Sequence, residues 1–295
     1  MWHALGEEEG ADDYANVEGG SVEQHRDQRL RLHHCANYAA LLTLLDGHGD
    51  DLLLLELGCG SGALSAAFAR SMPPNWRLLA TDYSEALVAR ARSVHGHPRL
   101  SFERLDARAL EPGRLAGVDV VLMLEVIEHM TPEDAVAVLH RFHRGLEPGA
   151  RLVMTTLDRS PFARAHSGYA PHAVEYSHRS MTEFLSARDN NPFDSFRVHR
   201  LASSRIAEEH VRAERFGGYF VNRLQRLVLG LAARSAALER ARASVMQLLY
   251  RGYSRLPKRD GFDLDGYVES IGCVRHGDAC PDGESFGLVV ELVKR

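Results

Sequence analysis

Residues 52–71 read LLLLELGCGSGALSAAFARS, which indicates a strand, a glycine-rich turn and a helix in direct succession. The leucine run suits a buried strand, and Gly58 ends it. Gly58, Gly60 and Gly62 allow a tight turn and a close approach of a ligand to the backbone, and the helix that follows offers N–H groups at its first turn. Units of this kind place a ligand beyond the carboxyl end of the strand.

The rest of the chain alternates between short apolar runs and amphipathic segments. Strands are expected at 52–58, 76–82, 100–106, 118–126, 149–157, 196–202 and 286–295. Helices are expected at 21–47, 61–72, 84–94, 131–146 and 181–188. The start of the fourth is the clearest, because Thr131 is a capping residue and Pro132 occupies the first helical position. The alternation predicts an α/β fold with a Rossmann-like, doubly wound sheet of seven strands, mostly parallel with an antiparallel last strand.

The composition is that of an ordinary globular protein. The 295 residues are 45% hydrophobic and 25% charged, and no apolar run approaches the roughly 20 residues that a membrane span needs. The acidic, glycine-rich residues 1–20 lack the basic and apolar regions of a secretory signal and are interpreted as a flexible tail. Residues 21–204 are expected to form the core with its N-terminal helix, 205–259 a helical insertion, and 260–295 the C-terminal strands that complete the sheet.

The cysteines bear on location and on metal binding. Cys35, Cys59, Cys273 and Cys280 show no framework spacing, which predicts a reducing, cytoplasmic location. The segment CVRHGDAC places His276 between the last two, but a zinc site would need a fourth ligand and a tighter pair. A polar loop between strands is the favoured interpretation.

Residues 205–259 differ from the rest in charge. Positions 204–259 hold twelve Lys/Arg and four Asp/Glu, a local charge of +8 that leaves −13 for the remainder. Phe216, Phe220 and Leu224 recur there at helical spacing. Three interpretations stay open: an amphipathic lid, with a homodimer contact; a membrane-surface helix that presents a lipophilic substrate; and a nucleic-acid surface. The acidic balance of the whole chain counts against nucleic acid.

Acids follow the strands on either side of the glycine turn. Asp82 ends the second strand, and Asp106 ends the third in the run LDAR. With the acid-led loop ELGCGSG, the run LEVIEHM and the later LEPGARLVMTT, they make residues 50–204 and 286–295 resemble the class I S-adenosylmethionine (SAM) dependent methyltransferases. The loop also satisfies the looser dinucleotide fingerprint of nicotinamide enzymes, but the chain after residue 160 does not suggest the second domain that such an enzyme should carry.

The resemblance implies SAM as cofactor and assigns residues to it. Glu56 would lie near the methionine end, Asp82 would bind ribose, and Asp106 with Ala107 would bind adenine. The cofactor-binding set that the resemblance implies is Glu56, Gly58, Gly60, Gly62, Asp82, Tyr83, Asp106, Ala107, Leu124 and Glu125.

The segment VDVVLMLEVIEHM, residues 118–130, ends an apolar strand in two glutamates and a histidine. Glu125, Glu128 and His129 stand at i, i+3 and i+4, so they share one face if the backbone turns helical there. The run EVIEHM resembles ubiquinone-biosynthesis O-methyltransferases, which act on catechol-type rings. It also resembles the Hen1 small-RNA 2′-O-methyltransferases, in which such residues hold a divalent cation. That resemblance implies Mg²⁺ or Mn²⁺ on these three side chains.

The downstream segment PHAVEYSHRSMTEF offers a further ligand, His172 or Glu175, but lacks the basic, histidine-rich Phe-Glu-Trp signature of Hen1. Simpler roles stay open for the upstream acids and histidine, because E-x-x-E-H runs also occur in metal-free enzymes of this class. Glu128 would then cap the next helix, and His129 would line the pocket or act as a base.

The expected function is transfer of a methyl group from SAM to a small-molecule acceptor, at a hydroxyl oxygen. A hydroxyl needs a base or a metal to take its proton. The candidates for catalysis are His129, Glu125, His172 and His178. Two alternatives stay open: a metal-dependent RNA 2′-O-methyltransferase of the Hen1 type, and a non-catalytic SAM-binding interaction protein.

Overall fold

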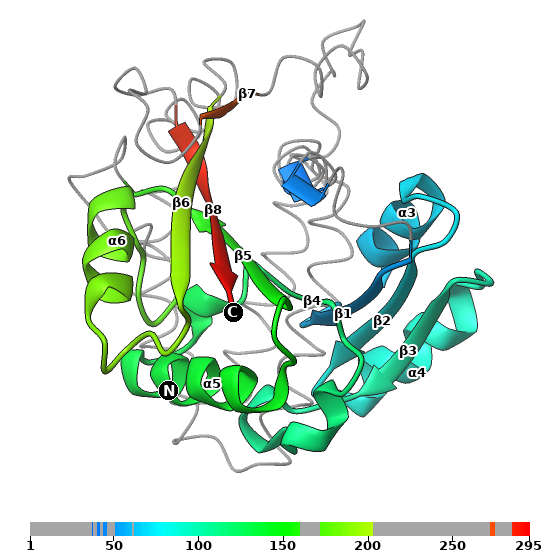
Figure 1. Ribbon diagram of the computed structural model, residues 1–295. Coiled ribbons are helices and arrows are strands. Elements are labelled where there is room, and N and C mark those ends of the chain that lie inside the picture. The colour runs from blue at the N-terminus through cyan, green and yellow to red at the C-terminus, as the bar shows by residue number, and fades with distance from the viewer. Residues whose placement is uncertain are drawn as a thin grey trace, which may run out of the picture.

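The computed structural model of the protein describes residues 37, 40, 41, 44, 45, 51–60, 62–159, 172–202, 272–274 and 285–295. These residues contain one mixed sheet with the strand order β3-β2-β1-β4-β5-β8-β6-β7 (Figure 1). The strands are β1 Leu53–Leu57, β2 Arg77–Asp82, β3 Leu100–Arg104, β4 Val120–Leu124, β5 Arg151–Leu157, β6 Ser195–Ala202, β7 Gly272–Val274 and β8 Ser285–Val293. Strands β1 to β5 pair in parallel, and β8 runs antiparallel to both β5 and β6.

The seven-stranded, mostly parallel sheet expected from the sequence is confirmed. The short strand β7 extends it by pairing with the end of β6. The chain runs outward from β1 to β3 and then returns to β4 on the other side of β1, so the strand order reverses between β1 and β4. Ligands of open α/β sheets bind at such a reversal, beyond the carboxyl ends of the strands.

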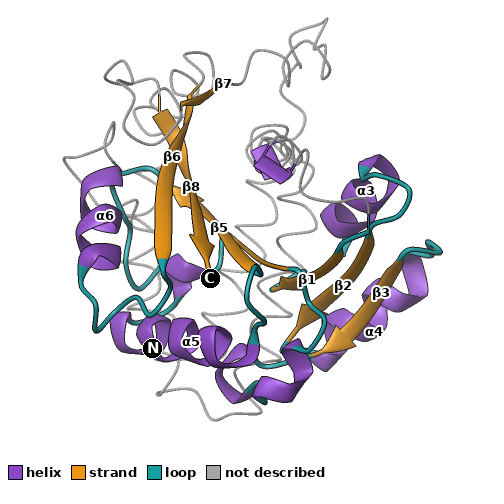
Figure 2. Ribbon diagram, viewed as in Figure 1, coloured by secondary structure: helices purple, strands orange, loops and turns teal. Residues whose placement is uncertain are grey.

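Helices cover the sheet on both faces (Figure 2). The helices are α3 Ala63–Ser71, α4 Glu85–Val94, α5 Pro132–Gly145 and α6 His178–Ser186. Apolar side chains of α3 and α4 pack in one core, and those of α5 and α6 pack in the other. Successive residues of a strand point to opposite faces, so Leu54 lies in the first core and Leu55 in the second. This two-sided burial explains why the parallel strands are continuous apolar runs.

The helices begin at the capping residues that the sequence supplies. The Thr131 side chain accepts a hydrogen bond from the Asp134 N–H at 3.2 Å, and Pro132 follows it at the first helical position of α5. Ser84 caps α4 in the same way. Helix α6 starts three residues earlier than expected, because Ser177 and Ser180 form a reciprocal capping box.

An N-terminal helical segment also packs on the first core. Asn37, Ala40, Leu41, Leu44 and Leu45 are helical, and their spacing of three and four residues defines its buried face. Within the described residues, no helix is long and apolar enough to cross a membrane. Three predictions concern residues outside the part of the chain that the structure describes. They are the flexible tail at 1–20, the helical insertion at 205–259 and the zinc alternative at Cys273 and Cys280, which depends on the undescribed Cys280.

Candidate functional site

The carboxyl ends of the parallel strands bring the predicted site residues to one edge of the sheet. Along this edge the strand order places Asp106 after β3, Asp82 at the end of β2, the glycine turn after β1 and Glu125 after β4. Segments that are far apart in the sequence therefore form a continuous row. The strand order alone accounts for this part of the site.

The turn after β1 requires glycine at three positions. Gly58, Gly60 and Gly62 have φ values of 74°, 54° and 72°, a left-handed region that other residues rarely adopt. A Cβ atom on Gly58 would lie 2.8 Å from a Val126 methyl, and one on Gly62 would lie 2.6 Å from the Phe102 ring. The loop is thus packed closely against β3 and against the turn after β4.

Asp82 ties the glycine turn to the end of β2. Its Oδ2 accepts a hydrogen bond from the Gly60 N–H at 3.0 Å, and its Oδ1 accepts one from the Ser84 N–H at 2.9 Å. Burial raises the pKa of Asp82, although both hydrogen bonds lower it. The carboxylate expected at the ribose therefore also fixes the loop that would receive the cofactor.

Asp106 caps the 3₁₀ helix Ala107–Ala109 and is held by Arg108. The Arg108 guanidinium donates to Oδ1 at 3.0 Å and to Oδ2 at 2.7 Å, and the backbone N–H of the same residue donates to Oδ1. Partial burial raises the pKa of Asp106, but the hydrogen bonds and charge of Arg108 outweigh it, so the pKa lies below its ordinary value. The sequence did not assign Arg108 to the site.

The other residues assigned to the cofactor also lie at this edge. Glu56 is buried in β1, and its carbonyl oxygen accepts a hydrogen bond from Thr81 at 2.7 Å. Tyr83, Ala107 and Leu124 are half-buried at the ends of β2, β3 and β4.

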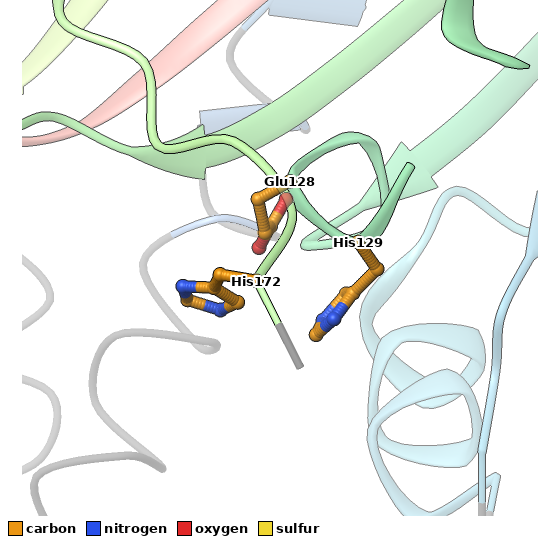
Figure 3. Close-up of side chains that lie close together, drawn as sticks. All are labelled: Glu128, His129 and His172. Carbon is orange, nitrogen blue, oxygen red and sulfur yellow. The ribbon is translucent and has the colours of Figure 1, made fainter. Parts of the chain in front are cut away.

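A second group of side chains lies beside the glycine turn, after β4. Glu128, His129 and His172 each offer a ligand atom, and these atoms all lie within 4.8 Å of one another. Glu128 and His129 come from the 3₁₀ helix Ile127–His129, and His172 comes from the segment that precedes α6 (Figure 3). The structure thus brings His172 to Glu128 and His129, which are more than 40 positions away from it in the sequence. We call this group the Glu-His-His cluster.

Glu125 does not belong to this cluster. It has a φ of 56°, so the chain turns sharply there and the expected helical face shared by Glu125, Glu128 and His129 does not form. The Oε1 atom of Glu125 instead accepts hydrogen bonds from Asn37 Nδ2 and Thr155 Oγ1, both at 3.0 Å. Glu125 links the N-terminal helical segment to the end of β5.

Glu128 is buried, and its surroundings favour the protonated carboxyl. Burial raises the pKa of Glu128 well above its ordinary value, and the negative charge of Glu125 raises it further. A hydrogen bond between the two carboxyls acts in the same direction, since Glu128 can donate it only when protonated. Thr156 Oγ1 donates to Glu128 Oε2 at 3.0 Å and lowers the pKa.

His172 is oriented by a neighbour, whereas His178 points elsewhere. The Nδ1 atom of His172 lies 2.8 Å from Glu175 Oε1, and its ring meets that of His129 edge-on with centroids 5.0 Å apart. The Nε2 atom of His178 lies 3.2 Å from the Val198 carbonyl oxygen of β6. The structure therefore does not bring His178 into the cluster, because its ring is engaged with the sheet.

Tyr176 is a further residue near the cluster that the sequence did not indicate. It is buried, and burial together with the charge of Glu128 raises the pKa of its phenol to about 12. Tyr176 therefore stays neutral at physiological pH and does not serve as a base.

The raised pKa of Glu128 leads to a prediction about stability. Because the folded-state pKa exceeds the ordinary value of 4.5, the contribution of Glu128 to the free energy of unfolding is fully present below pH 4.5 and is lost as pH rises through the folded pKa. Replacing Glu128 with glutamine should therefore stabilise the metal-free protein at pH 8, and less so at pH 5. Urea unfolding at both pH values measures this, with the exposed Glu133→Gln as control. Equal changes at the two pH values would contradict the prediction.

Comparison with known proteins identifies the domain. Residues 55–152, about a third of the chain, match the family model described as a methyltransferase domain. A ubiquinone biosynthesis O-methyltransferase of Pseudomonas aeruginosa is 30% identical over 112 residues, which are 37% of this chain and 46% of that protein. A carboxy-S-adenosyl-L-methionine synthase of Chromohalobacter salexigens is 34% identical over 105 residues, 34% of this chain and 38% of that protein. These matches thus cover less than half of the relatives' own length.

The fold has a counterpart among solved structures. Phosphoethanolamine N-methyltransferase 2 of Haemonchus contortus, solved with phosphomonomethylethanolamine and S-adenosylhomocysteine, matches 87% of this chain and 52% of its own, with a TM-score of 0.51 and 17% identity. At that identity the likeness concerns the fold. The matched domain and the sequence relatives, with the glycine turn at the strand reversal, show that residues 55–152 belong to a methyltransferase domain of the class I, SAM-dependent family.

Proposed function

We propose that this protein transfers the methyl group of SAM to a hydroxyl oxygen of a small-molecule acceptor, with the help of a divalent cation. The observation that carries the proposal is the position of the Glu-His-His cluster at the strand reversal, where its 3₁₀ helix follows Val126, the residue that packs against Gly58 of the glycine turn. The name of the Pseudomonas aeruginosa relative, an O-methyltransferase, supports the choice of oxygen.

The residues along the edge fit an elongated nucleoside cofactor. Asp106 and Asp82 supply carboxylates toward the β3 side, where ribose and adenine would bind. The glycine turn leaves the backbone of β1 open to close approach, and the cluster lies on the β4 side. When bound, SAM supplies an electrophilic methyl group on a sulfonium. We place that methyl group near β4, next to the Glu-His-His cluster.

The ligand atoms of the Glu-His-His cluster likewise favour a bound cation. One buried carboxyl and two imidazoles are a common ligand set for divalent metals, and three protein ligands leave positions for an acceptor. Burial raises the pKa of Glu128, and a cation held beside it would supply the positive charge that compensates its carboxylate. A cation held there would supply Lewis-acid polarisation of the acceptor oxygen. Glu128, His129 and His172 would hold it, and Mn²⁺ is the ion we propose, because Mg²⁺ prefers a set made of oxygen ligands.

The reaction is an in-line displacement, to which the chain contributes alignment and, through the proposed cation ligands, polarisation of the acceptor hydroxyl. The acceptor oxygen forms a bond to the methyl carbon while the carbon–sulfur bond breaks and its electron pair stays on sulfur, giving a neutral thioether. The hydroxyl proton must leave, and a cation on the acceptor oxygen would lower the pKa of the hydroxyl so that bulk water takes the proton, because His129 would use its one lone pair to hold that cation. Rigid placement by β4 and β5 supplies the alignment on which such transfers depend.

A methylation assay with radiolabelled SAM tests this proposal. Protein freed of metal by a chelator and reloaded with Mn²⁺ is offered a catechol, a monophenol, an amine and an RNA oligonucleotide. Turnover on a hydroxyl compound that requires the cation supports the proposal. Labelling of the RNA alone would support a Hen1-type enzyme, which gains no support from the relatives above. Binding of S-adenosylhomocysteine without turnover on any extract of small molecules would indicate a non-catalytic protein.

A further inference from the structure

Glu175 is a buried carboxyl next to the cluster that the proposed reaction does not use directly. Its side chain is 5% exposed and that of His172 is 8% exposed, with Glu175 Oε1 and His172 Nδ1 2.8 Å apart. Glu175 lies outside the group of mutually close ligand atoms formed by Glu128, His129 and His172. The structure therefore places Glu175 behind His172, whereas the sequence had offered Glu175 as an alternative metal ligand.

The segment that carries both residues is fixed to the turn after β4. The backbone N–H groups of Ala173 and Val174 both donate to the Glu128 carbonyl oxygen, at 2.7 and 3.1 Å. The N–H of Arg159 donates to the Tyr176 carbonyl oxygen at 2.9 Å, which ties the same segment to the end of β5. Glu175 and His172 thus face each other from a short stretch of chain whose position relative to Glu128 is set by backbone hydrogen bonds.

The chemistry of imidazole gives this contact a consequence. A neutral imidazole carries its proton on one nitrogen and keeps a lone pair on the other, and only the lone pair can bind a metal. A carboxylate at Nδ1 accepts a hydrogen bond from that nitrogen and so stabilises the tautomer with the proton there. In Figure 3 one nitrogen of the His172 ring is turned toward His129 and the other away from it.

We propose that Glu175 is a positioning residue: it holds the proton of His172 on Nδ1, so that Nε2 presents its lone pair to a divalent cation shared with Glu128 and His129. This inference rests on the proposed function, because it presumes that the cluster holds a cation. Carboxylates behind histidine ligands fix the ring orientation and raise its basicity, and their loss typically weakens metal affinity about 10–100-fold. Glu175 thereby gives His172 a defined orientation before any ion arrives.

The test is a calorimetric titration of Mn²⁺ into protein saturated with S-adenosylhomocysteine. In Glu175→Ala the Mn²⁺ Kd should rise about 10–100-fold, while the Kd for S-adenosylhomocysteine stays unchanged. Glu175→Gln keeps an oxygen that can accept a hydrogen bond from the Nδ1–H of His172, so it should retain most of the Mn²⁺ affinity. Glu183→Ala removes an exposed carboxyl of α6 that pairs with Arg179, and serves as the matched control with no change expected.

The outcomes separate this inference from the proposed function. Unchanged Mn²⁺ affinity in Glu175→Ala overturns the positioning role and leaves the proposed function standing. Loss of S-adenosylhomocysteine binding in both Glu175 variants would show a structural role and also overturn it. No Mn²⁺ binding by the wild-type protein overturns both. The nitrogen-15 shifts of the His172 ring give a second readout: the Nδ1-protonated tautomer is expected in the wild type, and a mixture in Glu175→Ala.

Discussion

Replacing His129 with alanine should lower kcat by at least about 100-fold, because the change removes one of the three proposed cation ligands and with it the polarisation of the acceptor hydroxyl. The affinity for S-adenosylhomocysteine should stay close to that of the wild type, since His129 lies on the β4 side of the edge and the cofactor carboxylates lie on the β2 and β3 side. Initial rates with the acceptor found in the methylation assay, alongside calorimetry with S-adenosylhomocysteine, give both numbers.

A histidine outside the Glu-His-His cluster provides the control. His140 lies on α5, where its Nε2 contacts the Asp189 carbonyl oxygen. His140→Ala should therefore leave kcat within about twofold, as expected for a surface substitution. Wild-type turnover in His129→Ala would remove this residue from the reaction and reduce the cluster to a lining of the pocket.

The second large effect concerns the glycine turn. Gly62→Ala should destabilise the protein by about 2–5 kcal/mol, because the left-handed backbone costs about 1–2 kcal/mol for any other residue and the new methyl group overlaps Phe102 and Ala91. Relief of that overlap must move the glycine turn away from β3. The affinity for S-adenosylhomocysteine should therefore fall at least about tenfold, the equivalent of roughly 1.4 kcal/mol. Urea unfolding and calorimetry measure the two effects.

Gly117 separates backbone strain from steric overlap. It has a φ of 73°, nearly that of Gly62, but an added Cβ atom would meet nothing within 4 Å. Gly117→Ala should cost only about 1–2 kcal/mol and leave the affinity for S-adenosylhomocysteine unchanged. Similar losses of stability and binding in the two variants would contradict the role given to close packing of the glycine turn.

Most of the sheet could be predicted from the sequence, because its signals are local. The run of leucines before Gly58 and the caps at Ser84 and Thr131 each act within a few residues, and the structure confirms them. The seven expected strands follow from the same short-range pattern. The early start of α6 was missed, although the serines at 177 and 180 were visible as a capping signal.

The geometry of the cluster could not be predicted in the same way. An i, i+3, i+4 spacing suggested a helical face, but Glu125 adopts a left-handed conformation, which is uncommon for a residue other than glycine and is imposed by its surroundings. The contacts of Glu125 with Asn37 and of Glu128 with Thr156 join residues 88 and 28 positions apart. Such pairs depend on the sheet that brings the segments together. Thr155 and Thr156 of β5 are visible in the sequence as two polar residues in an apolar strand. Only the folded sheet shows that they donate hydrogen bonds to Glu125 and Glu128.

A crystal structure with S-adenosylhomocysteine and Mn²⁺ tests the central claim most directly, that cofactor and cation share this edge of the sheet. The account predicts S-adenosylhomocysteine along the ends of β3, β2 and β1, and one anomalous peak for Mn²⁺ in contact with Glu128, His129 and His172. S-adenosylhomocysteine bound at the glycine turn with no anomalous peak at these three residues would contradict it.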